Sequence, residues 1–229
     1  SYGVSVITGA GLKEIKEGTA VYTKNGEEDT LDGDAILLAT GRGPNTEGLH
    51  AERAGVELTK RGAVVTDKHL RTTAENIWAA GDVCGNLQFT YISLDDSRII
   101  LSDMQGDGSR TTENRGAFAY SVFMEPSFSR AGLSEKEAAD KGLNYRVVRM
   151  NTDMIPKAKV LRKTTGMLKA VIDKDSGKIF GAALFCPESY EIINMVKLAM
   201  DHDLDYTVLR DFIYTHPTMS EGLNDLFVL

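Results

Sequence analysis

The sequence predicts a fold of mixed class, α/β in the first half of the chain and α+β in the second. Two observations support this expectation. In the first half, short apolar runs typical of buried strands end in glycine-containing turns, the arrangement at which open α/β sheets bind ligands. In the second half, strand-like runs alternate with capped helical segments, and the polar, Gly-rich stretch 106–116 separates the two halves as a linker.

The composition is that of an ordinary globular protein, with 42% hydrophobic and 26% charged residues among 229. A net charge of −7 offers no basic surface to nucleic acid, and no apolar run approaches the ~18 residues of a membrane-spanning helix. Cys84 and Cys186 form neither a CxxC pair nor a disulfide framework, so we expect a reducing, cytoplasmic setting. The chain starts at Ser1 rather than Met, and we expect it to be a fragment.

Several strands are expected near the start of the chain. Residues 4–8 alternate in the manner of a half-buried strand. Residues 19–24 and 27–31 flank Asn25-Gly26, the strongest short signal for a β-hairpin. Residues 34–39 are a short apolar run and predict a buried strand.

The next elements are short, with one exception. Residues 49–54 predict one or two helical turns that Gly55 ends. Residues 63–66 and 77–80 predict two further strands. A longer helix is expected over 90–104, directly after the second of these strands and its turn.

Beyond residue 117 the predicted elements alternate. Strands are expected over 120–124, 145–150, 166–173 and 179–185, the last two joined by a turn at 174–177. Ser134 and Glu137 have the spacing of a capping box, which opens a short helix that Gly142 ends.

A second helix of this half is expected to start at Pro187, placed at the first helical position. Glu188 and Glu191 then lie in the first turn, where carboxylates suit the helix dipole. One face of the helix is formed by Ile192, Met195, Val196 and Ala199. We interpret the methionine as core filling rather than as part of a cofactor site.

Residues 72–82 are the first of three stretches that can carry chemistry. Their apolar run ends at Gly81 and Asp82, and small residues there let a ligand lie close to the backbone. The carboxylate of Asp82 can accept hydrogen bonds from ligand hydroxyl groups at the end of a strand. The alternative is an ordinary turn, because Gly-Asp is a common turn pair.

The second stretch, residues 38–46, reads Leu-Ala-Thr-Gly-Arg-Gly-Pro-Asn-Thr. It follows an apolar run and contains two glycines and a proline. From the residues alone, it is a crossover between domains.

The third stretch, residues 215–221, lies close to the C-terminus and contains His216 and Glu221. A histidine carries protons near neutral pH, and a carboxylate can orient the ring and stabilise its charged form. The alternative is structural: Thr218 and Glu221 fit a capping box, which makes Glu221 a helix-start residue and leaves His216 in a loop. The two roles of Glu221 are compatible.

The other histidines and both cysteines are not expected to carry chemistry. His50, His69 and His202 are isolated among polar neighbours and are expected to be solvated. Cys84 is interpreted as a packed thiol and Cys186 as a core residue, so neither is expected to be a redox centre. No metal site is expected.

Together, the three stretches resemble the class I pyridine nucleotide-disulfide oxidoreductases, the flavoprotein disulfide reductases. Residues 72–82 are similar to the family's T-x6-A-x-G-D run, residues 39–45 to its A-T-G-R-x-P-N hinge, and residues 216–221 to its H-P-T-x-S-E ending. The motifs occur in the family's order, and the resemblance covers essentially the whole chain.

The resemblance implies roles for individual residues. Gly81 and Asp82 bind FAD, with the aspartate holding the ribityl chain, and Gly41 lies near the pyridine nucleotide NAD(P)H. His216 is the acid/base beside the redox thiols of the other subunit, and Glu221 hydrogen-bonds it. The backbone at a helix N-terminus, with its charge of roughly +0.5, faces the flavin pyrimidine ring. That segment is Gln88, Phe89, Thr90 and Tyr91.

The resemblance also implies an architecture, part of a two-dinucleotide-binding-domain flavoprotein fold with a C-terminal α+β domain. Residues 1–40 would end the NAD(P)-binding domain, 41–115 would be the returning segment of the FAD-binding domain, and 116–229 would be the dimerisation domain of a homodimer. Residues 87–96 look most like the bacterial reactive-chlorine-resistance flavoproteins. The last four residues lack the cysteine pair of true mercuric reductases.

The implied function is NAD(P)H-dependent reduction of a small-molecule disulfide, oxidant or metal ion. The family's CxxxxC pair and GxGxxG loops are absent from this chain, so we expect the fragment alone to be inactive. One alternative is a flavoprotein of the NADH oxidase or coenzyme A disulfide reductase type, against which the H-P-T-x-S-E ending argues. Another is a non-catalytic dimerisation module. The electron acceptor and the choice of NADH or NADPH are set by residues outside this sequence.

Overall fold

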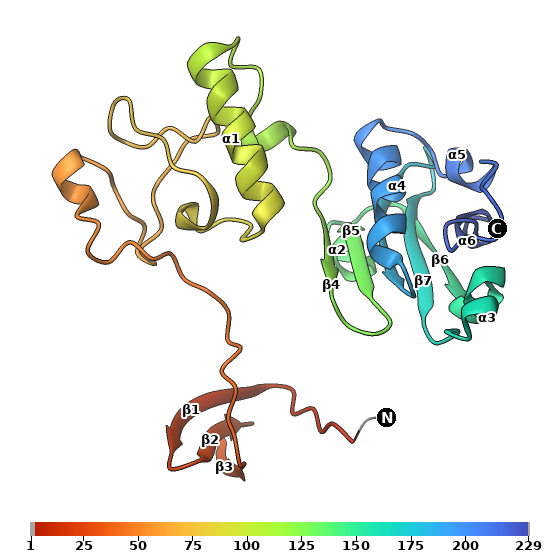
Figure 1. Ribbon diagram of the computed structural model, residues 1–229, viewed down its shortest axis with the longest axis horizontal. Coiled ribbons are helices and arrows are strands. Elements are labelled where there is room, and N and C mark those ends of the chain that lie inside the picture. The colour runs from red at the N-terminus through yellow and green to blue at the C-terminus, as the bar shows by residue number, and fades with distance from the viewer. Residues whose placement is uncertain (1–2, 229) are drawn as a thin grey trace.

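The computed structural model describes residues 3–228, which form three parts along the chain (Figure 1). A three-stranded sheet comes first, followed by a largely irregular part with one long helix, and then a five-stranded sheet with several helices. Both sheets are antiparallel. An extended stretch of chain connects the first part to the second (Figure 1).

The first sheet contains β1 (Ala10–Lys16), β2 (Thr19–Lys24) and β3 (Glu27–Asp32), in that order. The predicted hairpin is confirmed: Lys24 pairs with Glu27, and both Asn25 and Gly26 have positive φ, as a two-residue hairpin turn requires. Strand β1 was not predicted, because a register shift between Leu12 and Glu14 interrupts its two-residue period.

Two predicted strands in this region are wrong. Residues 4–8 form no strand, and the side chain of Val6 is 79% exposed. Residues 34–39 also form no strand, and Leu37 is 89% exposed. An apolar strand needs neighbours that pair with its backbone and cover its faces, and within residues 3–228 no segment does so.

The middle part is built around α1 (Thr90–Gln105), which confirms the predicted helix. The predicted helical turn is also confirmed as the 3₁₀ helix η1 (Ala51–Ala54), and Gly55 follows it in a left-handed conformation. A second 3₁₀ helix, η2 (Gly81–Cys84), contacts α1. Residue Ile99 of α1 is fully buried in a small apolar cluster with Leu70 and Cys84.

The two strands predicted in this part are wrong as strands. Each is reduced to a single bridge, Val64 with Leu58 and Trp78 with Arg71. The chain is extended at these positions, but its apolar pattern alone does not produce a ladder when the hydrogen-bonding partners are missing from the described residues. The linker 106–116 contains the short 3₁₀ helix η3 (Thr112–Asn114), capped by Thr111.

The second sheet has the strand order β4-β5-β8-β7-β6. Its strands are β4 (Ala119–Val122), β5 (Phe128–Gly132), β6 (Tyr145–Asn151), β7 (Met167–Asp173) and β8 (Ile179–Phe185). Four of the five were predicted within a few residues; β5, with the sequence FSRAG, has no strong apolar alternation. Ala131, Ala182 and Ala170 align across three neighbouring strands and are almost fully buried.

Helix α4 (Ser189–Asp201) packs against β5 and β8. Its predicted apolar face is confirmed: Ile192, Val196 and Ala199 are buried, and Met195 packs against the same core. The predicted start at Pro187 is wrong, because Glu188 adopts a left-handed conformation (φ 59°) and forces the helix to begin after it. The proline lies in the preceding turn.

The remaining helices of this part are short. The predicted capping box of α2 (Glu135–Asp140) is confirmed, with Ser134 and Glu137 exchanging both hydrogen bonds. The others are η4 (Thr152–Met154), α3 (Pro156–Leu161), α5 (Thr207–Arg210) and α6 (Gly222–Leu226). Helix α6 contributes fully buried Leu223 to the core under the sheet.

Candidate functional site

His216 and Glu221 lie together at the start of α6. The Nδ1 atom of His216 is 2.8 Å from Oε2 of Glu221, while Oε1 of the same carboxylate accepts the backbone N–H of Thr218 at 3.3 Å. In return, the hydroxyl of Thr218 accepts the N–H of Glu221. The predicted His–Glu contact is therefore present, and so are both hydrogen bonds of the predicted capping box. The helix itself begins only at Gly222, so these two bonds close the turn before α6. The imidazole is 69% exposed and the side chain of Glu221 only 15% exposed, so a mostly buried carboxylate holds an accessible ring.

Asp82 lies in η2, next to α1. Its side chain is exposed and has no hydrogen-bonding partner among the described residues. The preceding Gly81 is buried, with φ of 75°, and a Cβ there would be 2.6 Å from Oγ of Ser93 on α1. The backbone of η2 thus lies against α1 at van der Waals distance, and the carboxylate of Asp82 is exposed to solvent.

The N-terminus of α1 has no side-chain cap. Thr90 and Tyr91 occupy its first turn, where backbone N–H groups lack intrahelical partners. Phe89 flanks them and packs against two aromatic rings of the C-terminal part, Phe118 and Tyr120. Tyr91 packs against Phe118 as well. The hydroxyl of Tyr91 donates to the carbonyl of Ala119, and burial raises the pKa of this phenol to about 12. Gln88 is partly buried beside them.

Two adjacent carboxylates of α1 are part of this site and were missed by sequence reasoning. Asp96 is 3% exposed; its Oδ2 accepts the N–H of Gly81 at 2.7 Å, and its Oδ1 accepts a hydrogen bond from Arg115. Asp95 accepts a hydrogen bond from Arg110 at 2.5 Å. Nothing in the local sequence distinguishes this Asp-Asp pair from an ordinary solvated helix face.

Gly41 lies in the extended stretch before η1. It has φ of 103°, is exposed, and has no atom within 4 Å of an added Cβ. Gly41 lies between β3 and η1, Asp82 in η2, and His216 between α5 and α6, so the three residues come from separate segments of the chain.

Both cysteines are free and buried, as expected. Burial raises the pKa of Cys84 to about 11 and that of Cys186 to about 12. Thiols with such values hold little thiolate at neutral pH, which agrees with their interpretation as packing residues.

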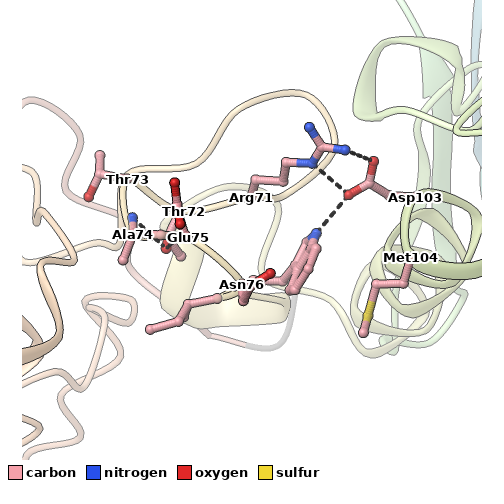
Figure 2. Close-up of a pocket in the computed structure, with 10 residues that line it drawn as sticks. Arg71, Thr72, Thr73, Ala74, Glu75, Asn76, Asp103 and Met104 are labelled. Carbon is pink, nitrogen blue, oxygen red and sulfur yellow. Dashed lines mark hydrogen bonds and ion pairs between the residues drawn. The ribbon is translucent and has the colours of Figure 1, made fainter.

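The prediction that His69 is solvated is wrong. Its side chain is only 21% exposed, and Nδ1 is buried 3.8 Å from Oδ1 of Asp103. This carboxylate forms a fork with the guanidinium of Arg71, as Figure 2 shows, and also accepts the indole N–H of Trp78 at 2.9 Å. The hydrogen bond from Arg71 holds the pKa of Asp103 below its usual range. A cavity of about 510 Å³ lies beside these groups.

Two family descriptions match the chain. The pyridine nucleotide-disulphide oxidoreductase description matches residues 1–97, and that of the pyridine nucleotide-disulphide oxidoreductase dimerisation domain matches residues 118–227. The chain belongs to the pyridine nucleotide-disulphide oxidoreductases. The resemblance found in the three sequence motifs is thereby confirmed.

Individual members of this oxidoreductase family match over almost all of the chain. RclA of Escherichia coli, described as a probable pyridine nucleotide-disulfide oxidoreductase, is 48% identical over 227 residues, covering 99% of this chain and 52% of RclA. A mercuric reductase of Staphylococcus aureus is 34% identical, covering 96% of this chain and 41% of that protein. The chain thus spans about half the length of the curated relatives it matches.

Solved structures of the family confirm the predicted fold class. A Cu(II) complex of a mutant of the HOCl-induced flavoprotein disulfide reductase RclA superimposes with a TM-score of 0.87 at 47% identity, covering 96% of this chain and 50% of that one. LpdA of Mycobacterium tuberculosis has a TM-score of 0.85 at 23% identity, covering 98% of this chain and 49% of that one, which supports the fold alone.

Proteins of this family use FAD and NAD(P)H. The residues present fit a flavin: an exposed carboxylate without a side-chain partner lies beside a buried glycine and an uncapped helix N-terminus. Within the described range, no group of three or more His, Cys, Asp or Glu side chains is placed to hold a metal ion. None of the helices in residues 3–228 combines the length and apolar character needed to cross a lipid bilayer.

Proposed function

We propose that the whole protein to which this sequence belongs is an FAD-dependent reductase that oxidises NAD(P)H and reduces a small-molecule disulfide, an oxidant or a metal ion. Residues 1–40 end its NAD(P)-binding domain, 41–115 return to the FAD-binding domain, and 116–229 form the dimerisation domain. Membership of the family and the similarity to RclA and to a mercuric reductase support this class of reaction. Two free, buried cysteines suit a reducing, cytoplasmic setting.

The exposed, unpartnered carboxylate of Asp82 is the observation that carries this proposal. In the whole protein it accepts hydrogen bonds from the ribityl hydroxyl groups of FAD. The segment 88–91 contains the start of α1, and the N–H groups of Thr90 and Tyr91 add a positive helix end beside it. When bound, FAD supplies the two-electron redox chemistry that the side chains of this chain cannot perform. Gly41, which has open space around it, lets the pyridine nucleotide approach the backbone.

His216 holds and moves the proton of the thiol chemistry. An ionised carboxylate only accepts hydrogen bonds, so the contact with Glu221 places a proton on Nδ1 of the imidazole. The other ring nitrogen, Nε2, is then free to take a proton from a thiol and return it. A protonated imidazole beside a thiol also lowers the pKa of that thiol.

A homodimer completes the proposed site. The chain just before His216 exposes large apolar side chains: Phe212 is 56% and Ile213 is 93% exposed. Apolar groups presented in this way on a dimerisation domain are expected to pack against a second copy. The partner's redox thiols would then meet the exposed face of the imidazole.

Removal of the Asp82 carboxylate tests the flavin role. In the whole protein, Asp82→Ala should weaken FAD binding roughly ten- to a hundredfold. This is the loss of affinity expected when one hydrogen bond to a charged acceptor is removed. Asp107→Ala is the control, because this exposed carboxylate of the linker bonds to Ser109 and Ser102 and to no residue of the loop that contains Asp82. FAD titrations of the apoproteins measure the effect. An Asp82→Ala protein that retains stoichiometric flavin at unchanged affinity would refute the proposal.

A further inference from the structure

We propose that Asp96 is a positioning residue for the flavin-binding loop, held in place by Arg115. This inference rests on the proposed role of Asp82. Asp96 does not reach toward the exposed face on which a flavin would lie, because its carboxylate is 3% exposed between the loop and the linker. It acts on the ligand through the backbone of the residue before Asp82.

The two oxygens of Asp96 have different partners. Oδ2 accepts the backbone N–H of Gly81 at 2.7 Å, and Oδ1 accepts a hydrogen bond from Nη2 of Arg115. A buried carboxylate is stable only if its charge and its lone pairs are satisfied. Here the bond to Gly81 fixes the loop, and the bond to Arg115 supplies the opposite charge that a buried carboxylate needs. Arg115 also faces a second carboxylate, because its Nε lies 3.4 Å from Oδ2 of Asp95.

The orientation of Asp82 depends on this bond. The side chain of Asp82 has no partner of its own in the described residues, so the backbone sets only the direction in which its Cα–Cβ bond leaves the loop. The backbone at Gly81 has φ of 75°, and a Cβ there would lie 2.6 Å from Oγ of Ser93. The loop is therefore seated on α1 with no spare space, and the bond to Asp96 holds it at that distance.

Arg115 links this loop to the C-terminal part. It lies at the end of the linker, and two residues later the N–H of Ala117 donates to Oδ1 of Asp201, the last residue of α4, at 2.6 Å. An added Cβ at Gly116 would be 2.4 Å from the same oxygen, so the linker lies directly against this side chain. Arg115 thus ties Asp96 to a segment that is itself fixed on the dimerisation domain.

The test compares FAD affinity in the whole protein for Asp96→Asn and a matched control. Gly81 and Arg115 bond to different oxygens of Asp96, and asparagine replaces one of these oxygens by an NH₂ group, which donates and cannot accept. The control, Asp103→Asn, alters a carboxylate that is equally buried on the same helix but bonds to Arg71 and Trp78. FAD titrations of apoprotein are run where circular dichroism shows each variant folded, and urea unfolding of the apoproteins is measured in parallel.

Asp96→Asn should weaken FAD binding roughly tenfold or more, the effect of losing one hydrogen bond to a charged group. Asp103→Asn should lower apoprotein stability to a similar extent and leave the affinity for FAD unchanged. The double variant with Asp82→Ala should bind no more weakly than Asp82→Ala alone, because a positioning residue has no effect once the group it positions is absent. If Asp96→Asn does not fold, Arg115→Lys replaces it and should weaken binding by a smaller factor.

Three results overturn the inference: wild-type FAD affinity in Asp96→Asn, an equal loss of affinity in Asp103→Asn, or full additivity in the double variant. The proposed function fails separately. If Asp82→Ala binds FAD with wild-type affinity, Asp82 does not anchor the flavin, and the positioning role of Asp96 fails with it. A loss in Asp82→Ala together with wild-type affinity in Asp96→Asn overturns the positioning role alone.

Discussion

Glu221 holds His216 with one carboxylate oxygen, 2.8 Å from Nδ1, and closes the turn before α6 with the other, which accepts the N–H of Thr218. The structural and the chemical interpretation of this motif are therefore two uses of a single side chain. Because the cap immobilises the carboxylate, the imidazole can be exposed and still keep a fixed orientation.

Two substitutions separate the roles of Glu221. Thr218→Ala removes the capping hydroxyl and should lower the free energy of unfolding by ~0.5–2 kcal/mol, while turnover keeps its pH dependence. Glu221→Ala removes both functions, so it should lower stability and also shift the pH profile of turnover. Thermal unfolding and pH–rate profiles of the whole protein measure these effects. Equal shifts of the pH profile in both variants would contradict the proposed division.

Gly81 should not tolerate a side chain. Gly81→Ala places a Cβ 2.6 Å from Oγ of Ser93 at a left-handed φ, and overpacking of this kind typically costs ~1–3 kcal/mol. Gly43→Ala is the control, since no atom lies within 4 Å of its added Cβ. Urea unfolding should show a loss for the first variant only. Ser93→Gly should recover part of the loss by removing the clash, and no recovery would argue against the steric cause.

The predictions that succeeded rest on local signals. Asn25-Gly26, the capping box at Ser134 and the His216–Glu221 spacing each involve residues within five positions of one another, so their geometry follows from the sequence nearby. These are the interactions that turn and capping rules describe.

The predictions that failed depend on distant partners. Residues 34–39 have the composition of a buried strand, but a strand exists only where other segments pair with it. Asp96 was missed for the same reason: its partner Arg115 is 19 positions away, and nothing in a helical Asp-Asp pair shows which carboxylate will be buried. Long-range pairing decides both cases.

Glu137 should make the stability of the C-terminal part sensitive to acid. The N–H and side chain of Ser134, together with Arg130, lower the pKa of this carboxyl from 4.5 to about 2. Its contribution to stability is therefore fully present above pH ~4.5 and is lost as the pH falls toward about 2. Glu137→Gln should flatten the dependence of the unfolding midpoint on pH in that window. Glu17→Gln, in the exposed turn after β1, is the control and should leave the curve unchanged.

The exposed apolar side chains before His216 should form part of a dimer interface. Such interfaces bury upwards of ~2,000 Å² and are largely apolar, so Ile213→Asp should shift the protein toward monomer. Leu31→Asp, at an exposed position of β3, should have no effect on assembly. Sedimentation velocity of the whole protein at micromolar concentration distinguishes the two. If Ile213→Asp remains a dimer, the interface does not include these side chains.

Replacement of His216 by glutamine in the whole protein tests the central claim most directly. Glutamine keeps the approximate size and polarity of the side chain but cannot carry the proton. General acid–base catalysis contributes ~10²–10⁴-fold, so turnover with a disulfide acceptor should fall by that order in stopped-flow and steady-state measurements. The rate at which NAD(P)H reduces the bound flavin should stay at the wild-type value, because that step does not use the histidine. Wild-type turnover across the pH range would contradict the account and leave His216 as a loop residue beside the Thr218–Glu221 hydrogen bonds.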